Sequence, residues 1–245
     1  MKKKKKKPKI IAIIPARGGS KRFPGKNLYL LNNRPLLSYP IAIAKKVKQI
    51  DKIIVSTDDK KIASIAKRYG AEVPFMRPSD LAGDNSPVVE AMAYTAKRLE
   101  QEQGFRADYI VLLQATNPLV QPEYVEKAIM LALEKKADSV VAVAPVDNIN
   151  HPYNIREILA GGTIKFWQEK KHYEFLKKPR PKFYHVASIW VSSYETLVNK
   201  KKIEGKRNFP LVVDPIYSLD IDYKQDLELI EAWLQYIQLK KLKRK

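Results

Sequence analysis

Glycines, cations and a serine are concentrated in residues 17–26, directly after a short apolar run. The run Ile10–Ile14 is rich in β-branched side chains and predicts a buried strand. Glycine lets backbone N–H groups approach a ligand closely, successive N–H groups can bind an anion, and arginine and lysine bind phosphate oxygens. We therefore expect this loop to hold a polyphosphate beyond the end of the strand. The alternative is a basic loop that faces solvent.

Two common phosphate-binding loops do not fit this segment. The Walker pattern requires Gly, four residues and then Gly-Lys-Ser/Thr, and the dinucleotide pattern requires Gly-x-Gly-x-x-Gly. Gly19 and Gly25 are six positions apart, and Lys26 is followed by Asn27. The loop therefore belongs to neither type.

A second candidate site is the acidic pair Asp220 and Asp222, which a single isoleucine separates. If this stretch is a strand, both carboxylates point to the same face, where they repel each other unless a cation lies between them. Magnesium is bound in proteins by one or two carboxylates together with substrate phosphates. The spacing therefore indicates a magnesium site. The alternative is a solvated acidic pair at the end of a strand.

Short β-rich runs alternate with helical segments before Pro145. Strands are predicted at Ile10–Ile14, Lys52–Ser56, Tyr109–Leu113 and Val140–Ala144. Helices are predicted at Leu36–Gln49, Asp59–Tyr69, Pro87–Gln103 and Pro122–Lys136. This order predicts an α/β fold with a doubly wound, mostly parallel sheet. Because ligands of such sheets bind beyond the carboxyl ends of the strands, the loops with Arg17, Asp58 and Gln114 are expected to meet there.

The alternation fades between about Pro145 and Pro210, where lysine-, tyrosine- and proline-rich stretches follow one another. We expect residues 1–9 to form a basic disordered arm and residues 10–245 a single domain. Within that domain, residues 145–210 are predicted to form an extension outside the main sheet. An amphipathic helix is predicted at Asp226–Lys241.

The chain of 245 residues carries a formal net charge of +20. Lys2–Lys7 contribute six of these charges and residues 240–245 a further five, which leaves +9 for the body. We interpret the tails as solvated arms and do not expect nucleic acid to be the main partner; a basic RNA-binding protein is the alternative of another class. No apolar run reaches membrane-spanning length, and the absence of cysteine excludes disulfides and cysteine-ligated zinc. A cytoplasmic location without membrane attachment is expected.

Five segments, in a fixed order, resemble the motifs of CMP-sialic acid synthetases, the acylneuraminate cytidylyltransferases. They span nearly the whole chain, and their joint occurrence is the specific signal. The segments are Pro15–Lys21 with Pro24–Asn27, Val55–Asp59, Arg77–Pro78 with Leu81–Asp84, Leu112–Leu119 and Ser218–Asp222. The resemblance implies a Rossmann-like nucleotidyltransferase that uses magnesium to join CTP and a 2-keto-3-deoxy sugar acid, sialic acid or a related nonulosonate, into a CMP-sugar. It also implies a homodimer in which the extension reaches the partner subunit and its sugar pocket.

The resemblance assigns roles to individual residues. The catalytic cations are expected to be Arg17, Lys21 and Lys26, with Lys26 nearest the α-phosphate. The nucleotide-binding residues are expected to be Arg17, Gly18, Ser20, Lys21, Lys26, Asn27, Arg77 and Ser86, with Asn27 on the ribose and Arg77 on the base. The sugar is assigned to Gln114 and Arg180, and the magnesium ion to Asp220 and Asp222.

Several of these residues have an alternative role. Ser86 fits a helix N-cap equally well. Arg77 could form a surface ion pair, and Arg180 could lie in a solvated basic loop. Arg22 is expected to face water. The three histidines, His151, His172 and His185, lack metal-ligand spacing, and His185 is expected to be structural.

The chain departs from the family pattern in three places near the expected sugar site. The family commonly has proline, arginine and Asn-Gly-Ala where this chain has Ala115, Val120 and Val186–Ser188. The nucleotide segments and the acidic pair are intact, so cytidylyl transfer is better supported than any particular sugar. A legionaminic- or pseudaminic-type acid fits as well as N-acetylneuraminate, and a nucleotidyltransferase for another sugar or another NTP is the remaining alternative.

Overall fold

The computed structural model describes residues 7–242, apart from the side chains of residues 238, 241 and 242. A six-stranded sheet with the order β10-β6-β9-β5-β1-β4 forms its centre. The strands are β1 (Ile10–Pro15), β4 (Lys52–Ser56), β5 (Tyr109–Leu113), β6 (Ser139–Pro145), β9 (Tyr184–Ser193) and β10 (Asn208–Val212). β1 is parallel to β4 and β5, and β6 is parallel to β10, whereas β9 runs antiparallel between β5 and β6. The predicted mostly parallel α/β sheet is confirmed, with one antiparallel strand inside it.

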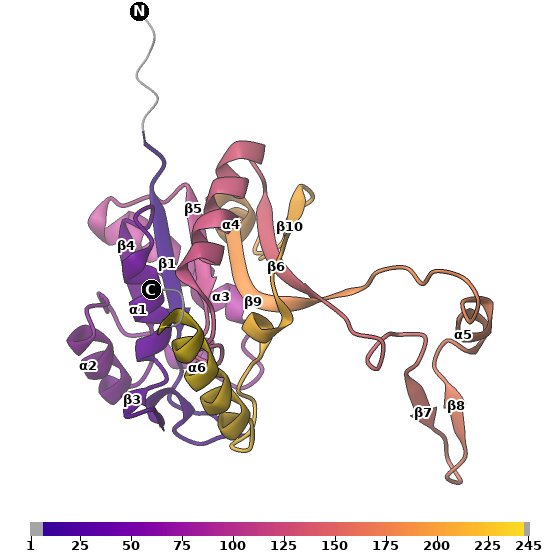
Figure 1. The fold of residues 1–245 in the computed structure, drawn as a ribbon. Helices are drawn as coiled ribbons and strands as arrows, with labels where there is room; N and C mark the ends of the chain where they lie inside the picture. Colours follow the sequence, from indigo (N-terminus) through magenta and orange to yellow (C-terminus); the bar gives the residue numbers. More distant parts are fainter. Residues whose placement is uncertain (1–6, 243–245) are drawn as a thin grey trace, which may run out of the picture.

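Helices cover both faces of the sheet (Figure 1). Successive side chains of a strand point to opposite faces, so the apolar run of β1 contributes to two separate cores. Ile10 and Ile14 pack in the core beneath α1 (Ser38–Lys46), α2 (Lys60–Arg68) and α4 (Pro122–Lys135). Ile11 and Ile13 pack in the core beneath α3 (Val88–Gln103) and the π-helical turn η3 (Glu195–Asn199). This burial on both faces explains why the strand reads as a continuous apolar run.

Local residues explain where the helices begin and end. Gly70, with φ of 91°, follows α2, and Gly104, with φ of 61°, ends α3, as glycine permits this left-handed conformation. α1 begins at Ser38 and not at the predicted Leu36, and the preceding Arg34–Pro35 forms β3, paired with β2 (Leu30–Leu31). The N-cap of α3 is Pro87, so the alternative role of Ser86 as a helix cap is wrong.

The C-terminal helix α6 (Asp226–Leu242) fixes two loops of the expected site. Its Leu227 and Ile230 are buried against Phe23 of the phosphate loop and against Ile221. Ile221 is the residue that separates the two predicted magnesium ligands. The helix and both loops therefore share one small core. Within residues 7–242, no helix has the length and apolarity needed to cross a membrane.

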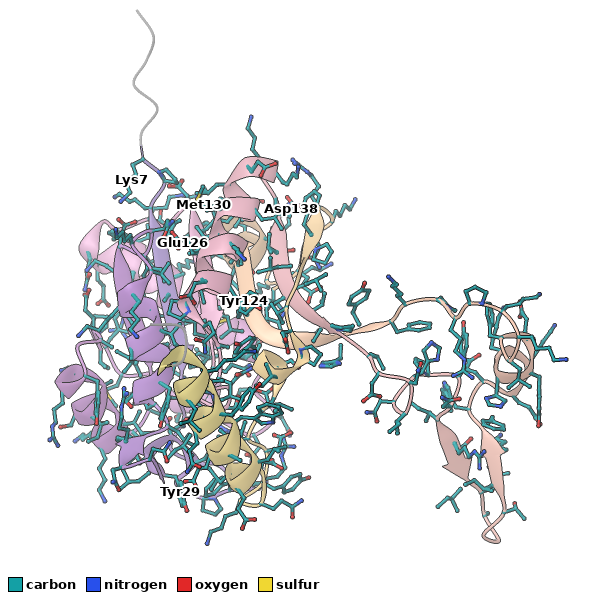
Figure 2. All side chains as sticks on the ribbon, in the orientation of Figure 1. Lys7, Tyr29, Tyr124, Glu126, Met130 and Asp138 are labelled. Atoms are coloured by element: carbon teal, nitrogen blue, oxygen red, sulfur yellow. The ribbon has the colours of Figure 1, made fainter. Side chains whose placement is uncertain are left out.

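Residues 146–183 leave the body as an arm, whose side chains stand apart from those of the body (Figure 1, Figure 2). The arm contains β7 (Arg156–Ile158), β8 (Ile164–Phe166) and α5 (Glu169–Glu174). It has its own aromatic contacts: the ring centroids of Tyr153 and Phe175 are 5.4 Å apart. The prediction that 145–210 lies outside the main sheet is therefore too wide, because β9 and β10 both belong to that sheet.

The basic arm predicted at residues 1–9 falls partly outside the described residues, which begin at Lys7. Lys7, labelled in Figure 2, lies at the start of the described chain. It forms an ion pair with Asp51 at 3.5 Å. The backbone N–H of Lys9 donates to the Asp108 carboxylate at 2.7 Å, so Lys9 is anchored beside β5. Residues 243–245, part of the basic C-terminal tail, also lie outside the described range.

Candidate active site

A cleft of about 460 Å³ lies where the loops after β1 and β5 meet the acidic pair. Ten of the twelve residues assigned from the sequence line it. They are Arg17, Ser20, Lys21, Lys26, Asn27, Arg77, Ser86, Gln114, Asp220 and Asp222. The two others, Gly18 and Arg180, are not among its lining residues. The convergence of loops that follow strands, expected from the sequence, is thus observed.

The cations at the start of the phosphate loop are held by an acidic side chain. Arg17 Nη1 lies 3.0 Å from one carboxylate oxygen of Asp84, and Lys21 Nζ lies 2.6 Å from the other. The hydrogen bond from Lys21 lowers the pKa of Asp84 below its usual value. Arg17 also donates to the carbonyl of Gly83 at 3.0 Å. Asp84 therefore links the phosphate loop to the loop after Arg77, a role that the sequence analysis did not assign.

Gly18 serves close packing of two strand-end loops. Its N–H donates to the Asp58 carboxylate at 3.1 Å, so this donor faces the loop after β4. A Cβ atom at this position would lie 2.9 Å from Oδ2 of Asp59, which is closer than real contacts allow. Asp59 in turn caps α2 by accepting from the N–H groups of Lys61 and Ile62. The glycine is therefore required for the approach of the loop to this cap.

Lys26 is a half-buried cation in the wall of the cleft. Its Nζ donates to the carbonyl of Ile221 at 2.9 Å, directly between the two aspartates. Burial lowers the pKa of Lys26, and the nearby Asp222 carboxylate opposes this shift. The neighbouring Asn27 donates through Nδ2 to the carbonyl of Arg17 at 2.9 Å and so holds the loop in shape.

Arg22 lines the cleft as well, and the expectation that it only faces water is wrong. Its Nη1 lies 3.2 Å from a carboxylate oxygen of Asp222. Both side chains are partly exposed, so this ion pair is accessible to solvent. Its attraction to the acidic pair was not visible in the sequence because Arg22 and Asp222 belong to distant segments.

The acidic pair does not lie on a strand, so the same-face argument, which holds for a strand, does not apply to it. Residues 219–225 are irregular and connect η4 (Pro215–Ser218) to α6. Ile221 is fully buried, and its N–H donates to the carbonyl of Thr116 at 2.8 Å. Asp220 and Asp222 nevertheless both line the cleft, because the buried side chain between them anchors the segment.

The two carboxylates have different surroundings. Asp220 accepts hydrogen bonds from the hydroxyls of Ser188 at 2.9 Å and Thr116 at 3.2 Å. Burial raises the pKa of Asp220, and these hydrogen bonds oppose the shift. Asp222 is half exposed, and its backbone N–H donates to the Asp226 carboxylate at 2.8 Å. One carboxylate is thus held rigidly while the other faces solvent.

Arg77 is buried, so the alternative of a surface ion pair is wrong. It donates through Nη2 to the carbonyl of Ser56, and burial lowers the pKa of its guanidinium. Within residues 7–242, its Nε is buried without a hydrogen-bond partner. Ser86 donates to the carbonyl of Asp80 at 2.7 Å, which closes the loop that contains η2 (Ser79–Leu81).

The remaining polar groups lie at the end of β5 and in the arm. The side-chain oxygen of Gln114 lies 3.2 Å from the Thr116 hydroxyl, whose single hydrogen is shared with Asp220. Arg180 lies in the arm and not in the cleft of its own chain. His185 Nε2 lies 2.9 Å from the Ser218 hydroxyl, and His151 and His172 also have hydrogen-bond partners, as expected for structural histidines.

Residues 11–243 match a family model described as cytidylyltransferase. The chain is 33% identical over 228 residues to a CMP-N,N'-diacetyllegionaminic acid synthase of Legionella pneumophila, covering 93% of this chain and 97% of the relative. It is 30% identical over 224 residues to an N-acylneuraminate cytidylyltransferase of Escherichia coli, covering 90% of this chain and 51% of the relative. A solved CMP:2-keto-3-deoxy-manno-octonic acid synthetase complexed with CTP shares the fold: its TM-score is 0.68 at 16% identity, covering 93% of this chain and 99% of that one.

Proposed function

The chain belongs to the cytidylyltransferase family, and we propose that it joins CTP to a nonulosonic sugar acid to give a CMP-sugar and pyrophosphate. One observation carries this proposal: the cations of the phosphate loop and the carboxylates of Asp220 and Asp222 line a single cleft. The relatives named for legionaminic and N-acylneuraminic acids support a nonulosonate as the acceptor. We propose a cytoplasmic location for this reaction, because CTP is available there.

In this reaction the anomeric hydroxyl oxygen of the sugar acid attacks the α-phosphorus of CTP, and the hydroxyl proton is released to water. A new P–O bond forms while the bond from the α-phosphorus to the pyrophosphate oxygen breaks. Arg17, Ser20 and Lys21 hold the triphosphate, and Lys26 stabilises the charge that develops at the α-phosphate. Lys26 suits this role because its ammonium group is half-buried and fixed by the Ile221 carbonyl. When the triphosphate binds, its phosphates replace Asp84 as the ion-pair partner of Arg17 and Lys21.

Asp220 and Asp222 are proposed to hold a magnesium ion. The donor set fits, because these two carboxylates line the same cleft as the cations of the phosphate loop. Within residues 7–242 they do not belong to a group of three or more acidic, histidine or cysteine side chains, so the other ligands would come from the substrate and from water. Magnesium is commonly bound by one or two carboxylates, with substrate phosphates and water as the other ligands. When bound there, the ion would neutralise charge on the phosphate oxygens.

The roles proposed for the other cleft residues rest on a buried polar atom without a hydrogen-bond partner in the described chain and on the place of each residue in the cleft. The buried Nε of Arg77 has no partner in the described part of the chain, which suits a hydrogen bond to an acceptor on the pyrimidine base. Asn27 is proposed to contact the ribose and Ser86 the nucleotide, while Gly18 shapes the loop around them. Gln114, at the end of β5, is proposed to bind a hydroxyl or amide of the sugar.

We also propose a homodimer in which the arm docks on a second copy of the chain. Ile149, Ile158 and Trp167 of the arm have exposed fractions of 85%, 75% and 62%, which is costly for apolar side chains that remain in water. Docking would bury them. It would also bring Arg180, which is remote from the cleft of its own chain, to the sugar site of the partner.

Mixing two inactive variants tests the shared site. Lys26→Ala and Arg180→Ala protomers, unfolded together and refolded, form mixed dimers that contain one intact site if Arg180 acts on the partner. About a quarter of all sites would then be active, by the statistics of a two-fold dimer. If Arg180 acts within its own chain, or if the protein is monomeric, the mixture stays inactive.

Pyrophosphate release tests the reaction itself. Purified protein would be given CTP, UTP, ATP or GTP in turn, each with N,N'-diacetyllegionaminic, pseudaminic or N-acetylneuraminic acid and Mg²⁺. We expect release with CTP and at least one nonulosonate, and its loss when the acid is omitted. Equal rates with another nucleotide, or with a neutral sugar, would contradict the proposal.

A further inference from the structure

Ser188 has an unusual backbone conformation for its place in the fold. Five non-glycine residues in the described part of the chain have positive φ angles. Four of them lie in turns, at a helix end or in a loop, whereas Ser188, with φ of 37°, lies inside strand β9. A positive φ is unfavourable for any residue with a Cβ atom, and such residues persist where the surrounding structure holds them in place.

The conformation coincides with an irregularity of the sheet. The register between β6 and β9 shifts between Val141, which pairs with Trp190, and Val143, which pairs with Val186. β9 thus has extra residues opposite Ala142, and Ser188 is one of them. On its other side, β9 stops pairing with β5 at Ile189. Bulges of this kind redirect a side chain that regular alternation would point elsewhere.

The redirected side chain meets a carboxylate of the cleft. Ser188 is 98% buried, and its Oγ lies 2.9 Å from both carboxylate oxygens of Asp220. The second hydroxyl near Asp220, that of Thr116, contacts a single oxygen at a longer distance of 3.2 Å. Ser188 is therefore the side chain best placed to fix the orientation of this carboxylate.

We propose that Ser188 is a positioning residue for Asp220, and that the bulge in β9 and its positive φ serve this contact. The proposal rests on the proposed function, because Asp220 is a magnesium ligand there. Glycine would adopt the φ angle without strain but would offer no donor. A serine at this position accepts an unfavourable backbone conformation and provides the hydroxyl that orients the ligand, in the way that hydrogen-bond partners orient metal ligands in general.

Two substitutions separate the backbone from the hydroxyl. Ser188→Gly removes the hydroxyl and relieves the backbone, and Ser188→Ala removes the hydroxyl and keeps the strain. We expect Tm of the glycine variant to exceed that of the alanine variant by about 3 °C or more, measured without metal or nucleotide. Both variants should show the same loss, about 10- to 100-fold, in kcat or in the affinity for Mg²⁺ in the presence of CTP.

The pattern distinguishes positioning from a structural role. If Ser188 only maintained the fold, the more stable glycine variant would be the more active of the two. Wild-type kcat and Mg²⁺ half-saturation in both variants would overturn the proposal, as would a glycine variant no more stable than the alanine variant. Asp220→Asn is the benchmark. If it is inactive while both Ser188 variants are normal, only the positioning role fails; if it is fully active, the proposed metal site fails and the inference with it.

Discussion

Lys26 is hydrogen-bonded to Ile221 across 195 positions of sequence, with Nζ 2.9 Å from the carbonyl oxygen. This bond places a half-buried ammonium group beside the predicted magnesium ligands, because Ile221 lies between Asp220 and Asp222. The phosphate loop and the acidic segment thus meet at one backbone carbonyl.

We expect Lys26→Ala to lower kcat more than it weakens CTP binding. Lys26 is proposed to act where charge changes during transfer, and an interaction made mainly in the transition state lowers kcat and kcat/KM together. Steady-state kinetics with CTP and the sugar acid would measure both effects. Lys45→Ala is the matched control, because its Nζ also donates to a backbone carbonyl, that of Tyr69, away from the cleft. A change confined to KM for CTP would contradict the assignment.

Arg17→Ala is expected to weaken CTP binding and to lower kcat as well. Its guanidinium lies at the cleft and also donates to the carbonyl of Gly83 and to Asp84, so the variant loses both a phosphate contact and the link between two loops. Calorimetric titration with CTP and parallel kinetics would separate the two losses. Unchanged CTP affinity would show that Arg17 does not bind the triphosphate.

Asp84→Asn is expected to tighten triphosphate binding by about fivefold, the range of an exposed ion pair. The Asp84 carboxylate forms ion pairs with Arg17 and Lys21, so it competes with a triphosphate for these two cations and would also repel it. Titration with CTP and with inorganic triphosphate at several salt concentrations would measure the gain. Asp80→Asn, in the same loop, is the control. Weaker binding in the Asp84 variant would mean that its link between the loops matters more than its competition with phosphate.

Asp222→Asn is expected to reduce turnover by about 1,000-fold while the protein stays folded, because a metal ligand contributes several kcal/mol of transition-state stabilisation. Circular dichroism would verify the fold, and rates at limiting and saturating Mg²⁺ would measure the loss. Glu134→Gln, which removes a solvent-exposed charge next to Lys135, controls for net charge. Near-normal activity at limiting Mg²⁺ would exclude a ligand role for Asp222.

Tyr194→Phe is expected to lower the free energy of unfolding by about 1 kcal/mol near neutral pH. The buried Tyr194 hydroxyl donates to Glu100 of α3; burial raises the pKa of Tyr194 to about 12, and the hydrogen bond lowers the pKa of Glu100. Because the pKa of Glu100 is lower in the folded protein than in the unfolded chain, the hydrogen bond stabilises the fold fully above the unfolded pKa of glutamate. This stabilisation is lost as the pH falls through the pKa that Glu100 has in the folded protein.

Urea denaturation near neutral pH and below the glutamate range would test this pH dependence. The wild-type protein should lose more stability on acidification than Tyr194→Phe, so that the two curves converge. A difference that stays constant with pH would mean that Glu100 is not the partner that matters.

The central strands and most of the cleft could be predicted because their signals are local. β1, β4, β5 and β6 are covered on both faces, so each reads as an apolar run bounded by polar loops. β10 was missed because Pro210 and nearby lysines argue against a strand, although an edge strand tolerates proline. β9 was missed because it follows an arm that interrupts the βα alternation.

What remained hidden in the cleft depends on contacts between distant segments. Asp84 contacts Arg17 because two loops that are distant in the sequence fold together. The spacing of residues along the chain does not predict such a contact. Ser188 carries no sequence signal for a positive φ, since glycine and asparagine are the residues that usually indicate it. The acidic pair was located by its spacing, but its conformation could not be predicted, because the buried Ile221 anchors the segment through contacts with distant residues.

The place of β9 between β5 and β6 has a consequence for the synthesis of the protein. β5 and β6 follow one another among the sheet strands in the sequence, but β9 lies between them in the sheet. β9 is synthesised only after the whole arm. Until then a nascent chain presents two apolar strands with unpaired edges, which are sites for non-native pairing. The hairpin of β7 and β8 in the arm is local in sequence and can form before β9 is synthesised. The cleft itself is completed still later, when Asp220 and α6 emerge, so nucleotide cannot guide the earlier steps of folding.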